Sequence, residues 1–301
     1  MRKPDNIKDV VARINSVYST WRRDTSIVEM RKSWDNLYAS DEINCSTEEA
    51  LFSSVPCRWV KPDKVQQSAV IMYIHGGGFR LGSNDSHLKL MNDIALASGI
   101  NVLGVQYRLM PEFRYPAQLD DVFAVYKCLV ETDKYKNIVI IGDSAGGGLA
   151  ASLLQKLKQP SYEIPQPTAC VLLSPWLDMT LSGDSYNTRE QSDPVHQTKM
   201  LAILAKEYSN EKASLDSPLL SPLFGDLSAL PPTLIQVGDC EIGLDDSVSY
   251  SEAAIKAGSD TKVTVWPHMI HVFQMFSDQL TSADKAIDEI GKFIKTQTID
   301  G

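Results

Sequence analysis

Ser144 stands in a Gly-x-Ser-x-Gly pattern, which predicts an exposed nucleophile. Residues 137–141 before it form a short β-branched apolar run typical of a buried strand. Residues 145–158 after it carry leucines at helical spacing. A sharp turn between such a strand and helix would lift the serine hydroxyl clear of a sheet, and Gly142 and Gly146 would permit the strained backbone. Alone, the pattern also fits an ordinary glycine-rich turn.

The segment 75–79, His-Gly-Gly-Gly-Phe, predicts N–H donors for an oxyanion. It follows a predicted strand at 69–75, and its three glycines let the backbone pass close to a substrate with free N–H groups. A phosphate-binding loop is the alternative, but no Lys-Ser/Thr pair follows the glycines. We therefore expect an oxyanion hole here, completed by the N–H of Ala145 directly after the nucleophile.

The base of a serine-centred acyl transfer is expected among the C-terminal histidines. Of the five histidines, His75 belongs to the glycine loop, His87 begins a helix and His196 lies in an insertion. His268 and His271 follow the last predicted strand, and either satisfies the chain order nucleophile, acid, base. A metal site could use the same pair, but no third ligand cluster accompanies it.

The acid that orients the base should follow the predicted strand 233–237. The loop after this strand offers four carboxylates, Asp239, Glu241, Asp245 and Asp246. Asp245 or Asp246 would favour the N-terminus of the next helix, whereas Asp239 lies nearest the strand. Spacing alone does not choose among the four.

Strands alternate with helices from residue 55 onward, which predicts an α/β fold: a mostly parallel central sheet with helices on both faces. The expected strands are 69–75, 102–107, 137–141, 168–174, 233–237 and 262–266, and the expected helices are 86–97, 118–131, 145–158, 248–257 and a C-terminal helix over 283–294. Such sheets bind ligands at the carboxyl ends of their strands, where Ser144 lies.

Two segments depart from this alternation and are interpreted as a cap. Residues 1–50 show two amphipathic helical stripes, and residues 177–230 contain a helical stretch at 198–208 among prolines. Both would cover the site. The alternative is ordinary packing of these helices against the core.

The composition excludes several classes of function. The chain has 301 residues and a net charge of −9, which argues against nucleic acid as the main partner and leaves no basic face for membranes. Its five cysteines are widely spaced, so neither a disulfide framework nor a zinc site is expected. With no signal-peptide pattern and no membrane-spanning run, we expect a cytoplasmic protein without cofactor or metal.

Six motifs occur in a specific order along the chain. They are His75-Gly76-Gly77-Gly78-Phe79, Tyr107-Arg108-Leu109-Met110-Pro111-Glu112, Tyr115-Pro116-Ala117-Gln118-Leu119-Asp120-Asp121, Gly142-Asp143-Ser144-Ala145-Gly146-Gly147, Ser174-Pro175-Trp176 and Met269-Ile270-His271-Val272-Phe273. Together they resemble the bacterial hormone-sensitive-lipase family (family IV) of α/β-hydrolase esterases. The resemblance implies an α/β-hydrolase catalytic domain over 51–301, N-terminal cap helices over 1–50 and a further cap insertion at about 177–230. It also implies a carboxylesterase acting on small-molecule esters of short acyl chains, and members often form homodimers.

By motif, the resemblance assigns Ser144 as the nucleophile, His271 as the base, and Gly77, Gly78 and Ala145 as the oxyanion hole. The acid departs from the common Asp-Pro-Leu-x-Asp pattern. The loop is similar instead to a subgroup with Gly-x-x-Glu, which points to Glu241, although Gly243 replaces the subgroup's usual leucine. Asp239, Asp245 and Asp246 stay open as alternatives.

Three other functions fit the same fold: a lipase for long acyl chains, a deacetylase or amidase, and a non-catalytic protein that binds a small ligand. The last should lack part of the triad. We expect Arg108, Glu112 and Asp120 or Asp121 to form structural ion pairs. Trp176, Met179 and Phe79 fit either a pocket wall or the core.

Overall fold

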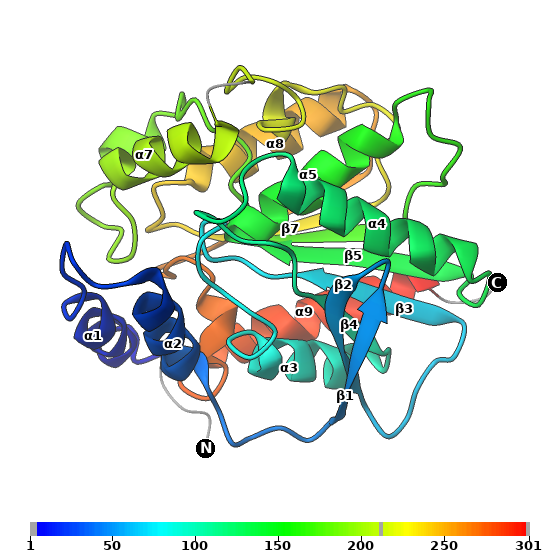
Figure 1. Cartoon of the computed structure of the whole chain (residues 1–301), viewed down its shortest axis with the longest axis horizontal. Helices are drawn as coiled ribbons and strands as arrows, with labels where there is room; N and C mark the ends of the chain where they lie inside the picture. Colours follow the sequence, from blue (N-terminus) through cyan, green and yellow to red (C-terminus); the bar gives the residue numbers. More distant parts are fainter. Residues whose placement is uncertain (1–4, 211–212, 299–301) are drawn as a thin grey trace.

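A computed structural model describes residues 5–210 and 213–298 (Figure 1). The parts of the expected domain ranges at 1–4, 211–212 and 299–301 lie outside these residues.

Within the described residues, an eight-stranded sheet forms the centre of the fold, in the order β1-β2-β4-β3-β5-β6-β7-β8. The pairs β1–β2 and β2–β4 are antiparallel, and all other neighbours are parallel. The strands are β1 (Ser46–Phe52), β2 (Val55–Lys61), β3 (Ala69–Ile74), β4 (Val102–Val105), β5 (Asn137–Asp143), β6 (Ala169–Leu173), β7 (Thr233–Gly238) and β8 (Thr261–Trp266).

Helices cover both faces of this sheet (Figure 1). They are α1 (Ile7–Tyr18), α2 (Ile27–Tyr38), α3 (Leu88–Ser98), α4 (Ala117–Glu131), α5 (Ser144–Leu157), α6 (Ser185–Thr188), α7 (Thr198–Ser209), α8 (Leu244–Lys256) and α9 (Thr281–Thr298), with short 3₁₀ turns η1 (Pro222–Phe224) and η2 (Phe273–Phe276).

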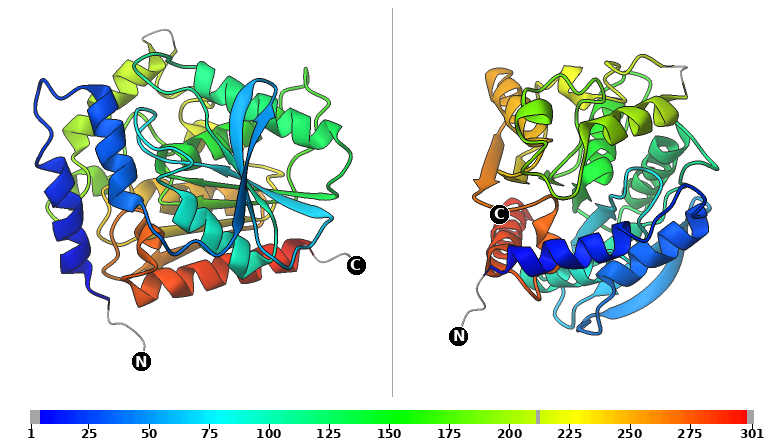
Figure 2. Two further views of the ribbon diagram at one scale, coloured as in Figure 1. Left: turned by 60° about the horizontal axis from the view of Figure 1, so that its bottom comes forward. Right: turned by 90° about the vertical axis from the view of Figure 1, so that its left-hand side faces the viewer.

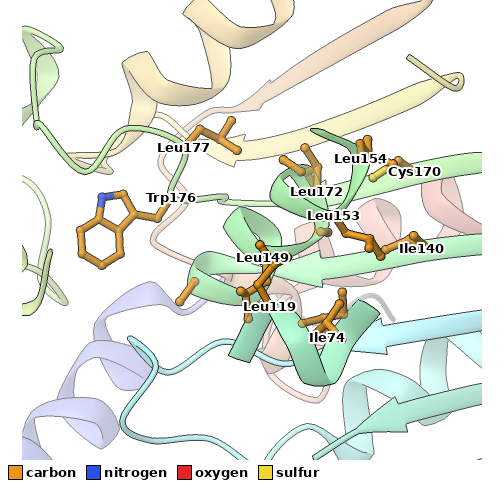
Figure 3. Close-up of a cluster of buried hydrophobic side chains, with 14 of the residues drawn as sticks. Ile74, Leu119, Ile140, Leu149, Leu153, Leu154, Cys170, Leu172, Trp176 and Leu177 are labelled. Carbon is orange, nitrogen blue, oxygen red and sulfur yellow. The ribbon is translucent and has the colours of Figure 1, made fainter. Parts of the chain in front are cut away.

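The central strands are buried on both faces, as their continuous apolar sequences require. One core lies between the sheet and the helices α4, α5 and α8, and a second lies between the sheet and α3 and α9. In Figure 3, Leu149 and Leu153 of α5 face the strands that carry Ile140 and Leu172. This packing fixes α5, and with it the turn that joins it to β5.

The strands expected from sequence occur in the structure with shifts of one or two residues at their ends, whereas β1 and β2 were not expected. β1 reads Ser-Thr-Glu-Glu-Ala-Leu-Phe and is mostly exposed at the sheet edge, so it carries no apolar alternation. The expected boundary at residue 50 falls inside β1.

Helices α1, α2 and α7 gather at one end of the molecule, on the left in Figure 1, and the side view in Figure 2 shows α7 across from α1 and α2. Val10 and Ile14 of α1 pack in a third cluster with Met269 and Phe273, which flank the C-terminal histidine. Arg31 of α2 donates to the carbonyls of Arg80 and Met110 and pairs with Glu112. The N-terminal helices are therefore fixed directly to the loops that follow β3 and β4.

Candidate active site

Ser144 lies at the junction of β5 and α5 with a φ of 51°, a left-handed conformation that is costly for serine. The flanking glycines make this turn possible. A Cβ on Gly142 would lie 2.3 Å from the Gly146 carbonyl oxygen. A Cβ on Gly146 would lie 2.1 Å from the Ile74 carbonyl oxygen. The Gly-x-Ser-x-Gly spacing is thus a steric requirement of the turn.

Asp143 ties the turn to the glycine loop. Its buried carboxylate accepts hydrogen bonds from Tyr73 Oη at 2.7 Å and from Gly76 N at 3.0 Å, and lies 3.3 Å from His87 Nε2. Burial works to raise the pKa of Asp143, but the charge of His87 and these hydrogen bonds lower it below its ordinary value. An ionised, fully bonded Asp143 holds the two segments in register.

The glycine loop after β3 faces the same space as Ser144. Gly77 and Gly78 have φ values of 108° and 61°, and both line a cavity together with Ser144. A Cβ on Gly77 would lie 2.3 Å from the Leu81 carbonyl oxygen. Only glycine fits this position, because both the backbone angle and the space exclude a side chain.

His271 and Glu241 form a direct hydrogen-bonded pair. His271 Nδ1 lies 2.7 Å from Glu241 Oε2, and Oε1 accepts from Ser174 Oγ at 2.7 Å and from Gly238 N at 2.6 Å. Burial works to lower the pKa of His271, but the Glu241 carboxylate raises it above its ordinary value. The Glu241 side chain is only 1% exposed, so its orientation is fixed by these bonds.

The other candidate carboxylates have different partners. Asp239 Oδ1 accepts from the backbone N–H of His268 at 2.6 Å, and Asp245 accepts from that of Ser185 at 2.8 Å. Asp246 is buried and accepts from the backbone of the insertion. His268 is exposed. Among the alternatives that the sequence left open, the structure brings Glu241 and His271 together.

His271 Nε2 is buried and has no hydrogen-bond partner among residues 5–210 and 213–298. His271 and Ser144 line the same cavity. His271 Nε2 is therefore free to accept a proton from Ser144 or from a substrate. Catalytic hydrogen bonds between a base and a nucleophile often tighten only when substrate binds.

The cavity has a volume of about 650 Å³ and lies between the strand ends and the helices α1, α2 and α7. One wall is aromatic, with Tyr18 and Trp21 stacked at 4.7 Å and Trp34 next to them. The opposite wall is aliphatic, with Met200, Leu201 and Leu204. A small organic molecule fits such a space.

His196 was not expected at the site, yet its ring centroid lies 4.2 Å from that of His271. It also lines the cavity, as does Asp193 from the same segment. Spacing could not have indicated this contact, since the two histidines are far apart in sequence and the insertion carries no periodic pattern around His196.

The expected structural ion pairs form between Arg108 and Asp121 and between Glu112 and Arg31, and Asp120 pairs with Lys156. Trp176, Met179 and Phe79 are buried and belong to the core cluster rather than to the cavity wall. Figure 3 shows Trp176 on the loop after β6.

Residues 5–210 and 213–298 contain no group of three histidine, cysteine or acidic side chains placed to hold a metal ion. No helix in these ranges is both long and apolar enough to cross a membrane.

Comparison with known proteins identifies the fold and the family. A family model described as the alpha/beta hydrolase fold matches residues 71–275. The crystal structure of an esterase from the bacterial hormone-sensitive lipase family superposes with a TM-score of 0.92 and 35% identity, over 99% of both chains. This chain belongs to the bacterial hormone-sensitive lipase family of α/β hydrolases.

Two further proteins are similar to this chain over most of their length. An acetyl-hydrolase of Streptomyces hygroscopicus is 38% identical over 81% of this chain and 80% of its own. An esterase of Acinetobacter venetianus is 39% identical over 79% of this chain and 78% of its own. The chain is thus a hydrolase of a family whose matched members are named for ester cleavage.

Proposed function

We propose that this protein is a carboxylesterase that cleaves small esters of short acyl chains through a Ser144–His271–Glu241 triad and an acyl-enzyme intermediate. The observation that carries the proposal is the 2.7 Å contact between His271 Nδ1 and Glu241 Oε2, at a cavity that His271 and the strained Ser144 both line. A protein that only binds a ligand does not need a buried acid to orient a histidine. Here Glu241 orients His271, which lines the same cavity as Ser144.

In the proposed acylation step, His271 Nε2 takes the proton of the Ser144 hydroxyl as the oxygen attacks the ester carbonyl. The N–H groups of Gly77, Gly78 and Ala145 stabilise the oxyanion that develops. The tetrahedral intermediate collapses, the bond to the alcohol oxygen breaks, and the alcohol leaves with the proton from His271. Glu241 holds the imidazole in one tautomer and stabilises its charged form.

In deacylation, His271 removes a proton from water, which attacks the acyl-Ser144 carbonyl. The carboxylic acid is released, and the proton returns to Ser144. No cofactor or metal enters either step, since the base and the oxyanion donors are supplied by the chain.

Two observations support the proposed preference for short acyl chains: the volume of the cavity and the names of two relatives. A cavity of about 650 Å³ has to hold both halves of the ester. Besides the acetyl-hydrolase, a protein of Pseudomonas putida named ethyl acetate hydrolase is 28% identical over 82% of this chain and 81% of its own. Both names refer to esters of a two-carbon acyl group.

The test is hydrolysis of p-nitrophenyl esters from acetate to palmitate by the wild type and by Ser144→Ala. We expect a maximum at short acyl chains and a loss of at least about a thousandfold in kcat in the variant. The matched control is Ser161→Ala, an exposed serine outside the cavity, which should keep wild-type rates. A maximum at long chains would make the protein a lipase, and a folded but inactive wild type would support ligand binding without catalysis.

A further inference from the structure

The segment between α6 and α7 places a second histidine against the proposed base. The ring planes of His196 and His271 meet at 89° with centroids 4.2 Å apart, so the edge of one ring faces the plane of the other. Edge-to-face packing of this kind is favourable and restricts rotation of both rings. His196 thus limits the orientations that His271 can adopt.

Asp193 connects His196 to the acid loop, which is residues 239–243 between β7 and α8 and contains Glu241. Its Oδ1 accepts hydrogen bonds from the backbone N–H of Val195 at 2.8 Å and of His196 at 3.0 Å. Its Oδ2 accepts from the backbone N–H of Ile242 at 3.0 Å. The Asp193 side chain is 1% exposed, and breaking these bonds would leave a buried charge unsatisfied. One carboxylate therefore fixes the position of His196 and that of the acid loop together.

Two serines of the cap insertion, Ser185 in α6 and Ser192 after it, strengthen this link. Ser192 Oγ donates to the carbonyl of Cys240 at 3.1 Å, and Ser185 Oγ donates to that of Ile242 at 2.7 Å. These carbonyls lie on either side of Glu241. The insertion is thus hydrogen-bonded to the acid loop at both neighbours of the acid.

The charges around His271 agree with this role. Glu241 from the acid loop, Asp193 and His196 from the insertion, and Asp143 from the turn before Ser144 face it. Burial and the charge of His271 hold the pKa of His196 well below its ordinary value, so His196 is neutral at neutral pH. A neutral ring can pack against the imidazolium that forms on His271 without repelling it, and the Asp193 carboxylate favours that imidazolium.

We propose that Asp193 and His196 are positioning residues for His271, through which the cap insertion fixes the orientation of the base and the loop of its acid. The proposal rests on the proposed function of Ser144, His271 and Glu241. It adds that the insertion, besides enclosing the cavity, helps to hold His271 and Glu241 in their catalytic orientation.

The variants His196→Ala, His196→Phe and Asp193→Asn test the proposal with p-nitrophenyl acetate. We expect His196→Ala to lower kcat by about tenfold with KM changed by less than about twofold, because the base is misplaced rather than the substrate. His196→Phe keeps a planar ring in the same place and should recover most of the lost kcat. Asp193→Asn should lower kcat and shift the acid limb of kcat/KM to lower pH, because a negative charge near His271 is removed.

The histidine side-chain NMR spectrum supplies a second readout that does not depend on turnover. In wild type, His271 should titrate at a higher pH than in Asp193→Asn, and its resonance should shift in His196→Ala as the neighbouring ring is lost. Lys199→Ala, an exposed position on α7 outside the cavity, is the matched control and should leave both readouts unchanged.

Thermal unfolding shows whether each variant folds. If His196→Ala does not fold, the two more conservative variants, His196→Phe and Asp193→Asn, decide. The proposal is overturned if kcat stays within about twofold of wild type in His196→Ala, if only KM changes, or if His196→Phe is as slow as His196→Ala. A wild type that does not hydrolyse the ester would contradict the proposed function instead, while the NMR titration would still test the contact with His271.

Discussion

Ser174 and Glu241 share a hydrogen bond of 2.7 Å that joins the end of β6 to the acid loop after β7. Ser174 Oγ also accepts from the backbone N–H of Val272 at 3.1 Å, directly after His271. One hydroxyl therefore contacts both the proposed acid and the backbone of the residue that follows the proposed base. Because Glu241 Oε2 is left for His271, the carboxylate is held in one orientation from two sides.

Glu241→Gln should separate the proposed acid from its neighbours. The amide keeps the shape of the side chain but removes the charge that stabilises the imidazolium, so we expect kcat to fall by about 10³- to 10⁴-fold. Asp239→Asn is the matched control, since Asp239 contacts the backbone of His268, and should cost less than about tenfold. Steady-state kinetics with p-nitrophenyl acetate measures both. A greater loss in Asp239→Asn would assign the acid to Asp239.

The pH dependence of kcat/KM should report the raised pKa of His271. The base works only in its neutral form, so activity should fall as the pH drops through this pKa. Because Glu241 raises the pKa, the midpoint of the acid limb should lie above the ordinary imidazole value of about 6.5. In Glu241→Gln the midpoint should move to lower pH. An acid limb that does not move in this variant would contradict the assigned pair.

Gly77→Ala should damage both the fold and the activity. The new Cβ would lie 2.3 Å from a backbone oxygen, and the loop that carries the proposed oxyanion donors would have to move. Gly99→Ala is the matched control, because Gly99 is also left-handed but its Cβ would meet nothing closer than 3.9 Å. We expect Gly99→Ala to cost about 1 to 2 kcal/mol of unfolding free energy and to leave kcat unchanged. Urea unfolding and kcat measure the two effects; equal losses in both variants would contradict the prediction.

Much of the fold follows from the sequence because its central strands are mostly apolar runs that end at or next to a glycine. β3, β5 and β7 were expected within one or two residues of their bounds for this reason. β1 was not predicted because it is a polar edge strand whose pairing is set by its neighbour rather than by burial. Patterns of hydrophobicity carry no signal where a strand buries little.

The candidate site was predictable where a residue obeys a local backbone rule and not where it depends on tertiary contact. Ser144 could be predicted because its turn requires glycines at fixed positions on both sides. Glu241 could not be separated from Asp239 by spacing, since only the folded loop determines which carboxylate faces His271. His196 was set aside as part of an insertion, and its contact with His271 depends on how that insertion folds back.

Asp246→Asn should change how stability depends on pH. Burial and the nearby Asp178 raise the pKa of Asp246 to about 8, so the folded protein binds a proton there that the unfolded chain releases near its ordinary pKa of about 3.9. Wild-type stability from this group is therefore present at low pH and lost as the pH rises toward 8. Asparagine does not titrate and can keep bonds to Leu177 N and Tyr186 Oη.

Urea unfolding of wild type and Asp246→Asn at about pH 5 and pH 8 tests this linkage. The unfolding free energy of the variant should rise relative to wild type between the two values. A difference that stays constant, or that changes in favour of the wild type at the higher pH, would contradict a protonated Asp246.

The most direct test of the triad is to trap the acyl-enzyme. Wild type and Ser144→Ala are mixed with p-nitrophenyl acetate, quenched in acid within the first turnovers, digested and analysed by mass spectrometry. We expect one acetyl group on the wild-type peptide that contains Ser144 and none on the variant's peptide. Acetylation at another residue, or ester hydrolysis that survives in Ser144→Ala, would contradict it.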